Sequence, residues 1–262
     1  MSAIIIEDKI VHYEVLGRGK PIIFLHGWVG SWRYWIPAMQ SASASYRAYA
    51  FDLWGYGETA KENLNYSLEE QTELLDQFMN AMGIGKVALV GHGLGAVVAL
   101  LYASKHAFVV DRAMVISIPV LGKGVADDLD FQDPVGLTER LLNGSASVEA
   151  VRGEAGKIDP AAIHTSMEEL SYINLMEIAR QMTTASLVVQ GVRDPLVPNQ
   201  DLDDFGNLPS MFHQIIFSDA GHFPMLDRPN KFNRLMKDFL DLPSGQSPTQ
   251  LQLKDEWKRR VR

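Results

Sequence analysis

Two ionisable side chains in the C-terminal half of the chain have the types and the setting for acid–base chemistry. Asp194 lies in VRDPLVP and His222 lies in AGHFPMLDRP, and each follows a short apolar run. A carboxylate that orients an imidazole produces a general base that can take a proton from a hydroxyl group or from water. The usual partner of such a pair is a nucleophile, and the chain has no cysteine to supply a thiolate.

A glycine-rich turn is the third feature that could take part in chemistry. The segment VALVGHGLGAVVAL, residues 87–100, predicts a buried strand that runs through the turn GHGLG into an apolar helix. Gly93 is the middle residue of this turn. The turn lacks the lysine of a phosphate-binding loop, so it does not predict a nucleotide site.

These residues need elements that bring them together, and the chain alternates predicted strands with predicted helices. Apolar runs typical of strands covered on both faces begin with PIIFL and recur at residues 46–52, 86–91, 112–118, 186–191 and 213–218. The clearest helix covers residues 67–82, where Ser67 and Glu70 form a capping box. The first residues, AIII and IVHYEV, predict a hairpin around Asp8 and Lys9.

The alternation predicts a mainly parallel sheet with helices on both faces. Ligands bind at the carboxyl ends of the strands in such a sheet. Four segments directly follow predicted strands and are therefore expected at that edge. They are His26-Gly27-Trp28, the turn at residues 91–95, Asp194 and His222.

Five motifs in this order resemble those of the α/β-hydrolase family: FLHGW, FDLWGYGET, LVGHGLGA, VRDPLVP and AGHFPMLDRP. The resemblance extends from about residue 20 to residue 241. The members of the family that the chain resembles are serine esterase-like and lactonase-like. It implies an α/β-hydrolase fold, with a mostly parallel central sheet flanked by helices. It also implies that Asp194 is the acid and His222 the base of a catalytic triad, in the family's chain order.

The resemblance further implies an oxyanion hole and a substrate pocket. The backbone N–H groups of Trp28 and Leu94 are expected to hold the developing oxyanion. Trp28, His92 and Trp54 are expected to line an apolar pocket. For His92, packing is the alternative. The side chain of His26 is expected to brace its loop.

The chain departs from the family at position 93, where the nucleophilic serine is replaced by glycine. Glycine cannot form an acyl-enzyme, but it tolerates the positive φ that the turn requires. Three explanations remain open. In the first, Gly93 replaces a natural serine of a serine enzyme. In the second, glycine is the natural residue of an enzyme that uses a His222–Asp194 general-base dyad. In the third, glycine is the natural residue of a protein that only binds ligands.

The domain organisation follows from where the alternation breaks. Residues 1–242 are expected to form a single domain, with a helical lid inserted at about residues 120–184, before the strand that carries the acid. Residues 243–262 are expected to form a flexible linker and a short basic tail.

Composition limits the partners. The 262-residue chain has a formal charge of −8, which argues against nucleic-acid binding and against an anionic membrane surface. No segment reaches the roughly 20 apolar residues of a membrane span, and the N-terminus does not resemble a signal peptide. We expect a cytoplasmic monomer or homodimer that uses no metal and no cofactor.

The function predicted from these features is that of a protein of hydrolase descent, acting on a small, largely apolar ester, lactone or related carbonyl compound. Without the serine, it is expected to be impaired or inactive as a serine hydrolase. The alternatives are a non-catalytic protein that binds a small ligand, and a cofactor-free enzyme of lyase or oxygenase type that uses the His222–Asp194 dyad.

Overall fold

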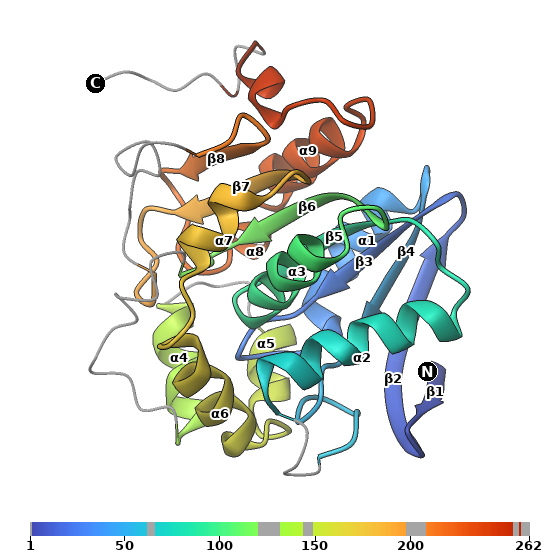
Figure 1. The fold of residues 1–262 in the computed structure, drawn as a ribbon. Coiled ribbons are helices and arrows are strands. Elements are labelled where there is room, and N and C mark those ends of the chain that lie inside the picture. Colours follow the sequence, from blue (N-terminus) through green and yellow to red (C-terminus); the bar gives the residue numbers. More distant parts are fainter. Residues whose placement is uncertain are drawn as a thin grey trace.

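A single eight-stranded sheet forms the centre of the molecule (Figure 1). The computed structural model describes residues 2–61, 66–119, 132–143, 149–197, 208–253 and 257. The strand order is β1-β2-β4-β3-β5-β6-β7-β8. The strands are β1 (Ser2–Ile6), β2 (Lys9–Gly17), β3 (Lys20–Leu25), β4 (Tyr46–Phe51), β5 (Val87–His92), β6 (Val110–Ile116), β7 (Ala185–Gly191) and β8 (Phe212–Phe217).

The sheet is parallel from β4 to β8 and antiparallel only at β1 and β2. The hairpin expected around Asp8 and Lys9 is present, with Ile6 paired to Lys9. The central strands are buried along almost their whole length, which explains their continuous apolar sequences. The predicted fold class is therefore confirmed.

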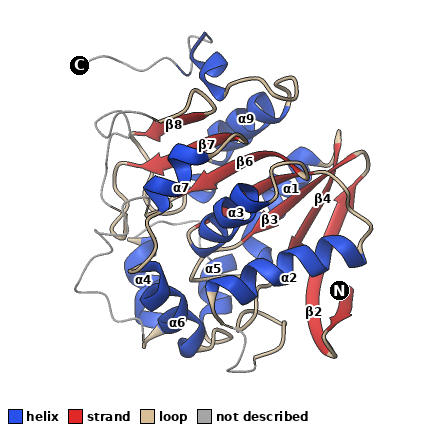
Figure 2. Ribbon diagram, viewed as in Figure 1, coloured by secondary structure: helices blue, strands red, loops and turns tan. Residues whose placement is uncertain are grey.

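Helices cover both faces of the sheet (Figure 2). α2 (Leu68–Ala81) and α3 (Leu94–Lys105) lie on one face, while α1 (Ile36–Ala42) and α9 (Pro229–Leu240) contact each other on the other face. α2 begins where the capping box predicts, because the Ser67 side chain accepts a hydrogen bond from the N–H of Glu70. A short 3-10 helix, η1 (Trp32–Trp35), precedes α1, and the short helix α8 (Pro224–Asp227) precedes α9.

Among the described residues, four helices lie between β6 and β7, in the segment expected to form the lid. They are α4 (Pro134–Leu142), α5 (Glu149–Ala155), α6 (Pro160–Leu170) and α7 (Leu175–Gln181). α4, α5 and α6 lie beyond the carboxyl ends of the strands, whereas α7 lies over the sheet and contacts α3 (Figure 1). Residues 120–131 and 144–148 of this segment lie outside the described residues. We call the helices α4 to α7 the lid below.

The C-terminal segment differs in part from the expected flexible linker and tail. Residues Pro248–Leu253 form the 3-10 helix η3, which contacts β7, β8 and α9. Leu251 is fully buried, and Trp257 is buried with its Nε1 2.9 Å from Asp238 Oδ2. This part of the segment packs on the domain because its apolar side chains are covered by the sheet and α9. None of the described helices is long and apolar enough to cross a membrane.

Candidate active site

Asp194 and His222 lie side by side at the carboxyl edge of the sheet. Asp194 follows β7 and His222 follows β8, and the His222 Nδ1 atom lies 2.9 and 3.0 Å from the two carboxylate oxygens. The carboxylate is itself fixed, because Asp194 Oδ1 accepts hydrogen bonds from the N–H groups of Leu196 and Val197. Both side chains are fully buried. The carboxylate therefore orients the imidazole with its proton on Nδ1.

The other ring nitrogen of His222 is left with a free lone pair. His222 Nε2 is buried and makes no hydrogen bond within the described part of the chain. The backbone oxygen of His222 accepts hydrogen bonds from His92 Nε2, at 2.8 Å, and from Ser117 Oγ, at 2.9 Å. A rigidly held imidazole with an unused acceptor is suited to removing a proton from a ligand or from water.

Gly93 occupies the sharp turn between β5 and α3. Its φ of 50° lies in the region that favours glycine, and its ψ is −114°. The turn packs closely on the rest of the site, because a Cβ atom on Gly95 would lie 2.4 Å from the oxygen of Leu25. We call residues 91–95 the elbow.

Trp28 closes the space beside Gly93. A Cβ atom at position 93 would lie 3.0 Å from Cε3 and 3.2 Å from Cζ3 of the Trp28 ring. The other side of the same ring reaches the lid, where Nε1 donates a hydrogen bond of 3.0 Å to Ser166 Oγ on α6. Trp28 is fully buried, and its ring contacts both the elbow and the lid.

One of the two expected oxyanion donors, Leu94, lies within the elbow, and the other, Trp28, lies beside Gly93. Leu94 is the first residue of α3, where backbone N–H groups have no partner within the helix. Neither the Trp28 N–H nor the Leu94 N–H donates a hydrogen bond to another described residue. The Trp28 loop is held against the elbow by a hydrogen bond of 2.9 Å from the Gly95 N–H to the His26 oxygen.

His26 braces the Trp28 loop through both of its ring nitrogens. Its Nε2 accepts a hydrogen bond from the Leu53 N–H at 3.0 Å, and its Nδ1 donates to the Gly27 oxygen at 2.9 Å. Complete burial lowers the pKa of His26 below 6.5, although nearby Asp52 opposes this shift. The ring is therefore neutral and structural.

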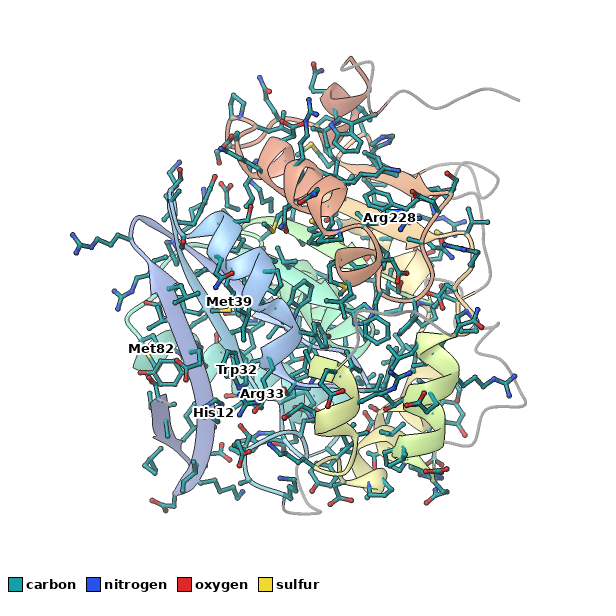
Figure 3. The ribbon with its side chains drawn as sticks, turned by 180° about the vertical axis from the view of Figure 1, so that it is seen from behind. His12, Trp32, Arg33, Met39, Met82 and Arg228 are labelled. Carbon is teal, nitrogen blue, oxygen red and sulfur yellow. The ribbon has the colours of Figure 1, made fainter. Side chains whose placement is uncertain are left out.

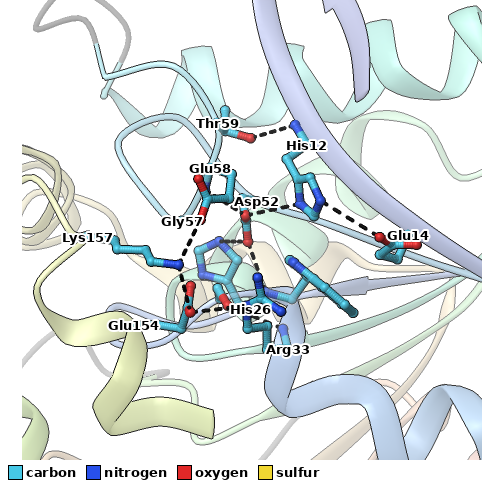
Figure 4. A network of polar contacts seen from close by, with 12 residues as sticks. His12, Glu14, His26, Arg33, Asp52, Gly57, Glu58, Thr59, Glu154 and Lys157 are labelled. Atoms are coloured by element: carbon cyan, nitrogen blue, oxygen red, sulfur yellow. Dashed lines mark hydrogen bonds and ion pairs between the residues drawn. The ribbon is translucent and has the colours of Figure 1, made fainter. Parts of the chain in front are cut away.

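Asp52 fixes two neighbouring loops (Figure 4). Its Oδ1 accepts a hydrogen bond from the Trp32 N–H at 2.9 Å, and its Oδ2 accepts one from the Glu58 N–H at 3.1 Å. His12 Nδ1 lies 3.5 Å from Oδ2. Although burial opposes it, contact with His12 and hydrogen bonds from the Trp32 and Glu58 N–H groups lower the pKa of Asp52, so this carboxylate stays charged and holds both loops.

His92 lies beside the dyad, with its ring centroid 4.6 Å from that of His222. Its Nε2 donates to the His222 oxygen, so its Nδ1 accepts a hydrogen bond of 3.0 Å from the Tyr34 hydroxyl. The Tyr34 oxygen in turn accepts the Gly27 N–H at 2.6 Å. Burial lowers the pKa of His92 well below 6.5. Both ring nitrogens of this expected pocket residue are engaged in holding the loops of the site.

Trp54, the other expected pocket residue, is buried away from these contacts. Its ring lies below the Lys9 amine, 5.7 Å from the nitrogen to the centroid, and its backbone is held by Gln71. Across the described residues, no hydrogen bond or ring contact joins Trp54 to the dyad or the elbow. Among these same residues, no group of three or more His, Cys, Asp or Glu side chains is placed to hold a metal ion.

Comparison with known proteins gives the family. A model of the α/β-hydrolase family matches residues 22–235, which is most of the chain. The chain belongs to this family. The fold and the hydrolase descent predicted from the motifs are thereby confirmed.

Individual α/β-hydrolases agree with this assignment. The 2-hydroxy-6-oxo-6-(2'-aminophenyl)hexa-2,4-dienoic acid hydrolase of Metapseudomonas resinovorans is 27% identical over 256 residues, covering 87% of this chain and 86% of the relative. The enol-lactonase of Burkholderia xenovorans LB400 superposes with a TM-score of 0.79 at 15% identity, over 91% of this chain and 99% of that one. A serine-to-glycine mutant of the N-acyl homoserine lactonase AidH, in complex with N-hexanoyl homoserine lactone, superposes with a TM-score of 0.78 at 18% identity, over 91% and 96% of the two chains.

An ionic network ties the lid of this α/β-hydrolase to its core (Figure 4). Glu154 on α5 is almost fully buried, and its Oε1 lies 3.0 Å from Arg33 Nε on η1. The same oxygen lies 3.1 Å from Lys157 Nζ, which also lies 2.7 Å from Glu58 Oε1. Viewed from behind, Arg33 lies beside Trp32, with its Cζ 5.1 Å from the ring centroid (Figure 3). We call these four charged residues the lid clamp.

The sequence gives no signal for several residues that shape the site. Ser166 is one of many polar residues in a lid helix, and Tyr34 lies 58 residues before its partner His92. Arg33 and Glu154 are 121 residues apart in sequence. Such pairs could be found only from the folded structure, because their contacts depend on how the lid docks.

Proposed function

We propose that this α/β-hydrolase binds a small, largely apolar ester or lactone at the elbow and acts on it without forming an acyl-enzyme. The observation that carries the proposal is the His222–Asp194 pair, with Nδ1 held by the carboxylate and a buried Nε2 that has no partner among the described residues. Gly93 has no atom that could attack the carbonyl carbon. The dyad therefore acts as a general base toward water.

The proposed reaction proceeds in two steps. His222 Nε2 takes a proton from water as the oxygen of that water forms a bond to the carbonyl carbon, and the N–H groups of Trp28 and Leu94 stabilise the resulting oxyanion. When the intermediate collapses, the bond to the leaving oxygen breaks and His222 returns the proton to it. Asp194 keeps the imidazolium oriented and stabilised throughout.

The expected rate is far below that of a serine enzyme. In triad hydrolases that have lost the nucleophile, the remaining oxyanion hole and binding contacts give about 10³–10⁴-fold acceleration over water. We expect the present chain to exceed that residual acceleration, because the His222–Asp194 dyad adds general-base catalysis of about 10²–10⁴-fold.

The test compares the protein with its His222→Ala and Asp194→Asn variants on short-chain activated esters and acyl lactones. The dyad mechanism requires slow turnover that His222→Ala lowers to the residual level of the oxyanion hole and binding contacts, and that Asp194→Asn strongly reduces. Turnover that is unchanged by His222→Ala would refute it. Lyase or oxygenase chemistry at the same dyad would give a different product from the same pocket, which product analysis separates from hydrolysis.

Ligand capture without turnover is the second candidate, and the Trp28 ring favours it. A Cβ atom at position 93 would make a tight contact of 3.0 Å with this ring, which is held by Ser166. This contact supports the two explanations in which glycine is the natural residue at position 93. Codon 93 of the natural gene tests directly whether glycine is the natural residue. Saturable binding of an ester or lactone with no turnover in any variant would select this function.

A further inference from the structure

A cavity of about 520 Å³ lies at the opposite end of the sheet from the dyad. It is bordered by the amino ends of β3, β4, β5 and β6 and by the residues that follow α9. This volume is within the range of small-molecule sites. Its charged lining residues are Lys20, Lys86, Asp111, Arg112 and Asp241.

Arg112 supplies a buried cation with one nitrogen unused. Its side chain is only 5% exposed, its Nε donates to Asp111 Oδ2 at 2.7 Å, and its Nη1 donates to the Phe239 oxygen at 2.6 Å. Arg112 Nη2 makes no hydrogen bond to another described residue. A guanidinium held in place by two of its nitrogens presents the third to the cavity as a fixed donor.

Two lysines add positive charge along the same edge. The strand register places Lys20 opposite Tyr46, and Lys86 precedes β5, the next strand in the sheet. Lys86 Nζ lies 3.2 Å from Asp111 Oδ1, whereas Lys20 Nζ forms no ion pair with a described residue. Lys20 is thus available to a ligand that also reaches Arg112.

The two carboxylates of the lining differ in their roles. Although burial opposes it, hydrogen bonds from Ser244 and Arg112 lower the pKa of Asp111 to about 2, so this carboxylate stays charged and is occupied by its protein partners. Asp241 adds a second negative charge to the lining. Three cationic and two anionic side chains leave the cavity with one net positive charge, on a chain whose formal charge is −8.

We propose that this cavity is a second binding site, for a small organic monocarboxylate. The carboxylate binds between Arg112 Nη2 and Lys20 Nζ, where charge-assisted hydrogen bonds are strongest. The apolar part of the ligand packs on Pro21, Val87 and Leu242. A dianion such as a phosphate monoester is disfavoured, because Asp241 would repel the second charge.

The test uses benzoate as the probe and benzamide as its neutral, isosteric control, with binding followed by amide chemical shifts of the full chain. We expect benzoate to bind at least about tenfold more tightly than benzamide, because only the carboxylate forms the charge-assisted contacts. Benzoate is expected to shift amides near Lys20 and Arg112. Equal binding of the two probes would refute the proposal.

Variants separate this site from the elbow and from general charge effects. Lys20→Gln should weaken benzoate binding about fivefold or more, and Asp241→Asn should strengthen it. Lys105→Gln, at the end of α3 and outside the cavity, is the matched control and should change nothing. His222→Ala should leave binding intact, and loss of binding in that variant would place benzoate at the elbow and overturn the proposal. Inorganic phosphate binding more tightly than benzoate would also contradict it.

Discussion

At the scale of single residues, Gly93 and Trp28 form a complementary pair. A glycine at 93 satisfies the positive φ of the elbow, and it also leaves room for a ring that would lie 3.0 Å from any Cβ atom there. The ring cannot move aside freely, since its Nε1 is hydrogen bonded to Ser166 and its surface is completely buried. Changing one member of the pair therefore strains the other.

Serine at position 93 is expected to restore little activity by itself. Gly93→Ser combines positive-φ strain with the Trp28 contact, so we expect a loss of about 1–3 kcal/mol in the free energy of unfolding. In Gly93→Ser combined with Trp28→Leu, the contact is relieved while the backbone N–H at position 28 is kept. Ester turnover should therefore be higher in the double variant than in either single variant.

The matched control is Gly93→Ala, which adds the same Cβ atom without a nucleophile. It should lose about as much stability as Gly93→Ser, measured by urea denaturation, and should gain no esterase activity with or without Trp28→Leu. A Gly93→Ser variant that is as stable as the original protein and fully active would show that the Trp28 contact does not matter.

The site residues differ in how well the sequence predicts them. Asp194, His222 and the elbow can be placed from motifs that follow strands, because the carboxyl ends of parallel strands meet at one edge. The contact of Trp28 with the lid cannot be predicted in this way, since it depends on a lid helix whose docking is set by packing. The roles of these residues in catalysis stay predictions until the variants are measured.

At the scale of elements, the lid clamp is the ionic connection between α5 and the core. Glu154 Oε1 serves both Arg33 and Lys157, while Glu154 Oε2 is buried without a hydrogen bond among the described residues. Breaking an ion pair of a shared, nearly buried carboxylate costs more free energy than breaking an exposed ion pair, because solvent screens the buried charges less. Loss of this charge should loosen α5 before it affects the sheet.

Glu154→Gln is expected to speed the opening of α5. Removing the charge leaves the Arg33 and Lys157 cations without their shared partner, and we expect a local cost of about 1–2 kcal/mol. Amide hydrogen exchange in α5 should rise about 5- to 30-fold, with little change in β5 and β6. Arg152→Gln is the control, since the Arg152–Glu139 pair is exposed on the lid surface and its loss should leave exchange unchanged. Equal exchange in Glu154→Gln and the original protein would show that the clamp does not hold the lid.

The elements themselves are predicted unevenly from the sequence. The six strands β3 to β8 follow from apolar runs, because extensive burial leaves a continuous signal, and β1 and β2 follow from the N-terminal hairpin pattern. The amphipathic helix α9 lies outside the predicted elements, although it has a clear apolar stripe at Phe232, Leu235, Met236 and Phe239. The packing of η3 cannot be predicted from the sequence, since a few buried apolar residues in a polar segment give no periodic pattern.

At the scale of the whole molecule, two buried neutral histidines should make stability depend on pH. Burial lowers the pKa of His26, and lowers that of His92 well below 6.5, whereas both groups titrate near 6.5 in the unfolded chain. As the pH falls below about 6.5, these two histidines therefore bind protons in the unfolded chain but stay neutral in the folded chain. The stability contributed by these groups is complete above that pH and is lost progressively below it.

The free energy of unfolding, measured by urea denaturation between pH 7.5 and pH 5, should decline below about pH 6.5, with a slope from these two groups of at most about 2.7 kcal/mol per pH unit. Asp52 does not contribute in this window, because its pKa is lowered from 3.8 and its stabilisation is lost only at lower pH. His92→Gln should reduce the limiting slope to about 1.4 kcal/mol per pH unit, whereas His164→Gln, on the exposed face of α6, should not change it. A flat profile down to pH 5, or an equal slope in His92→Gln, would mean that the buried histidines accept protons in the folded state. The hydrogen bonds that His26 Nε2 accepts from the Leu53 N–H and His92 Nδ1 accepts from the Tyr34 hydroxyl oppose this.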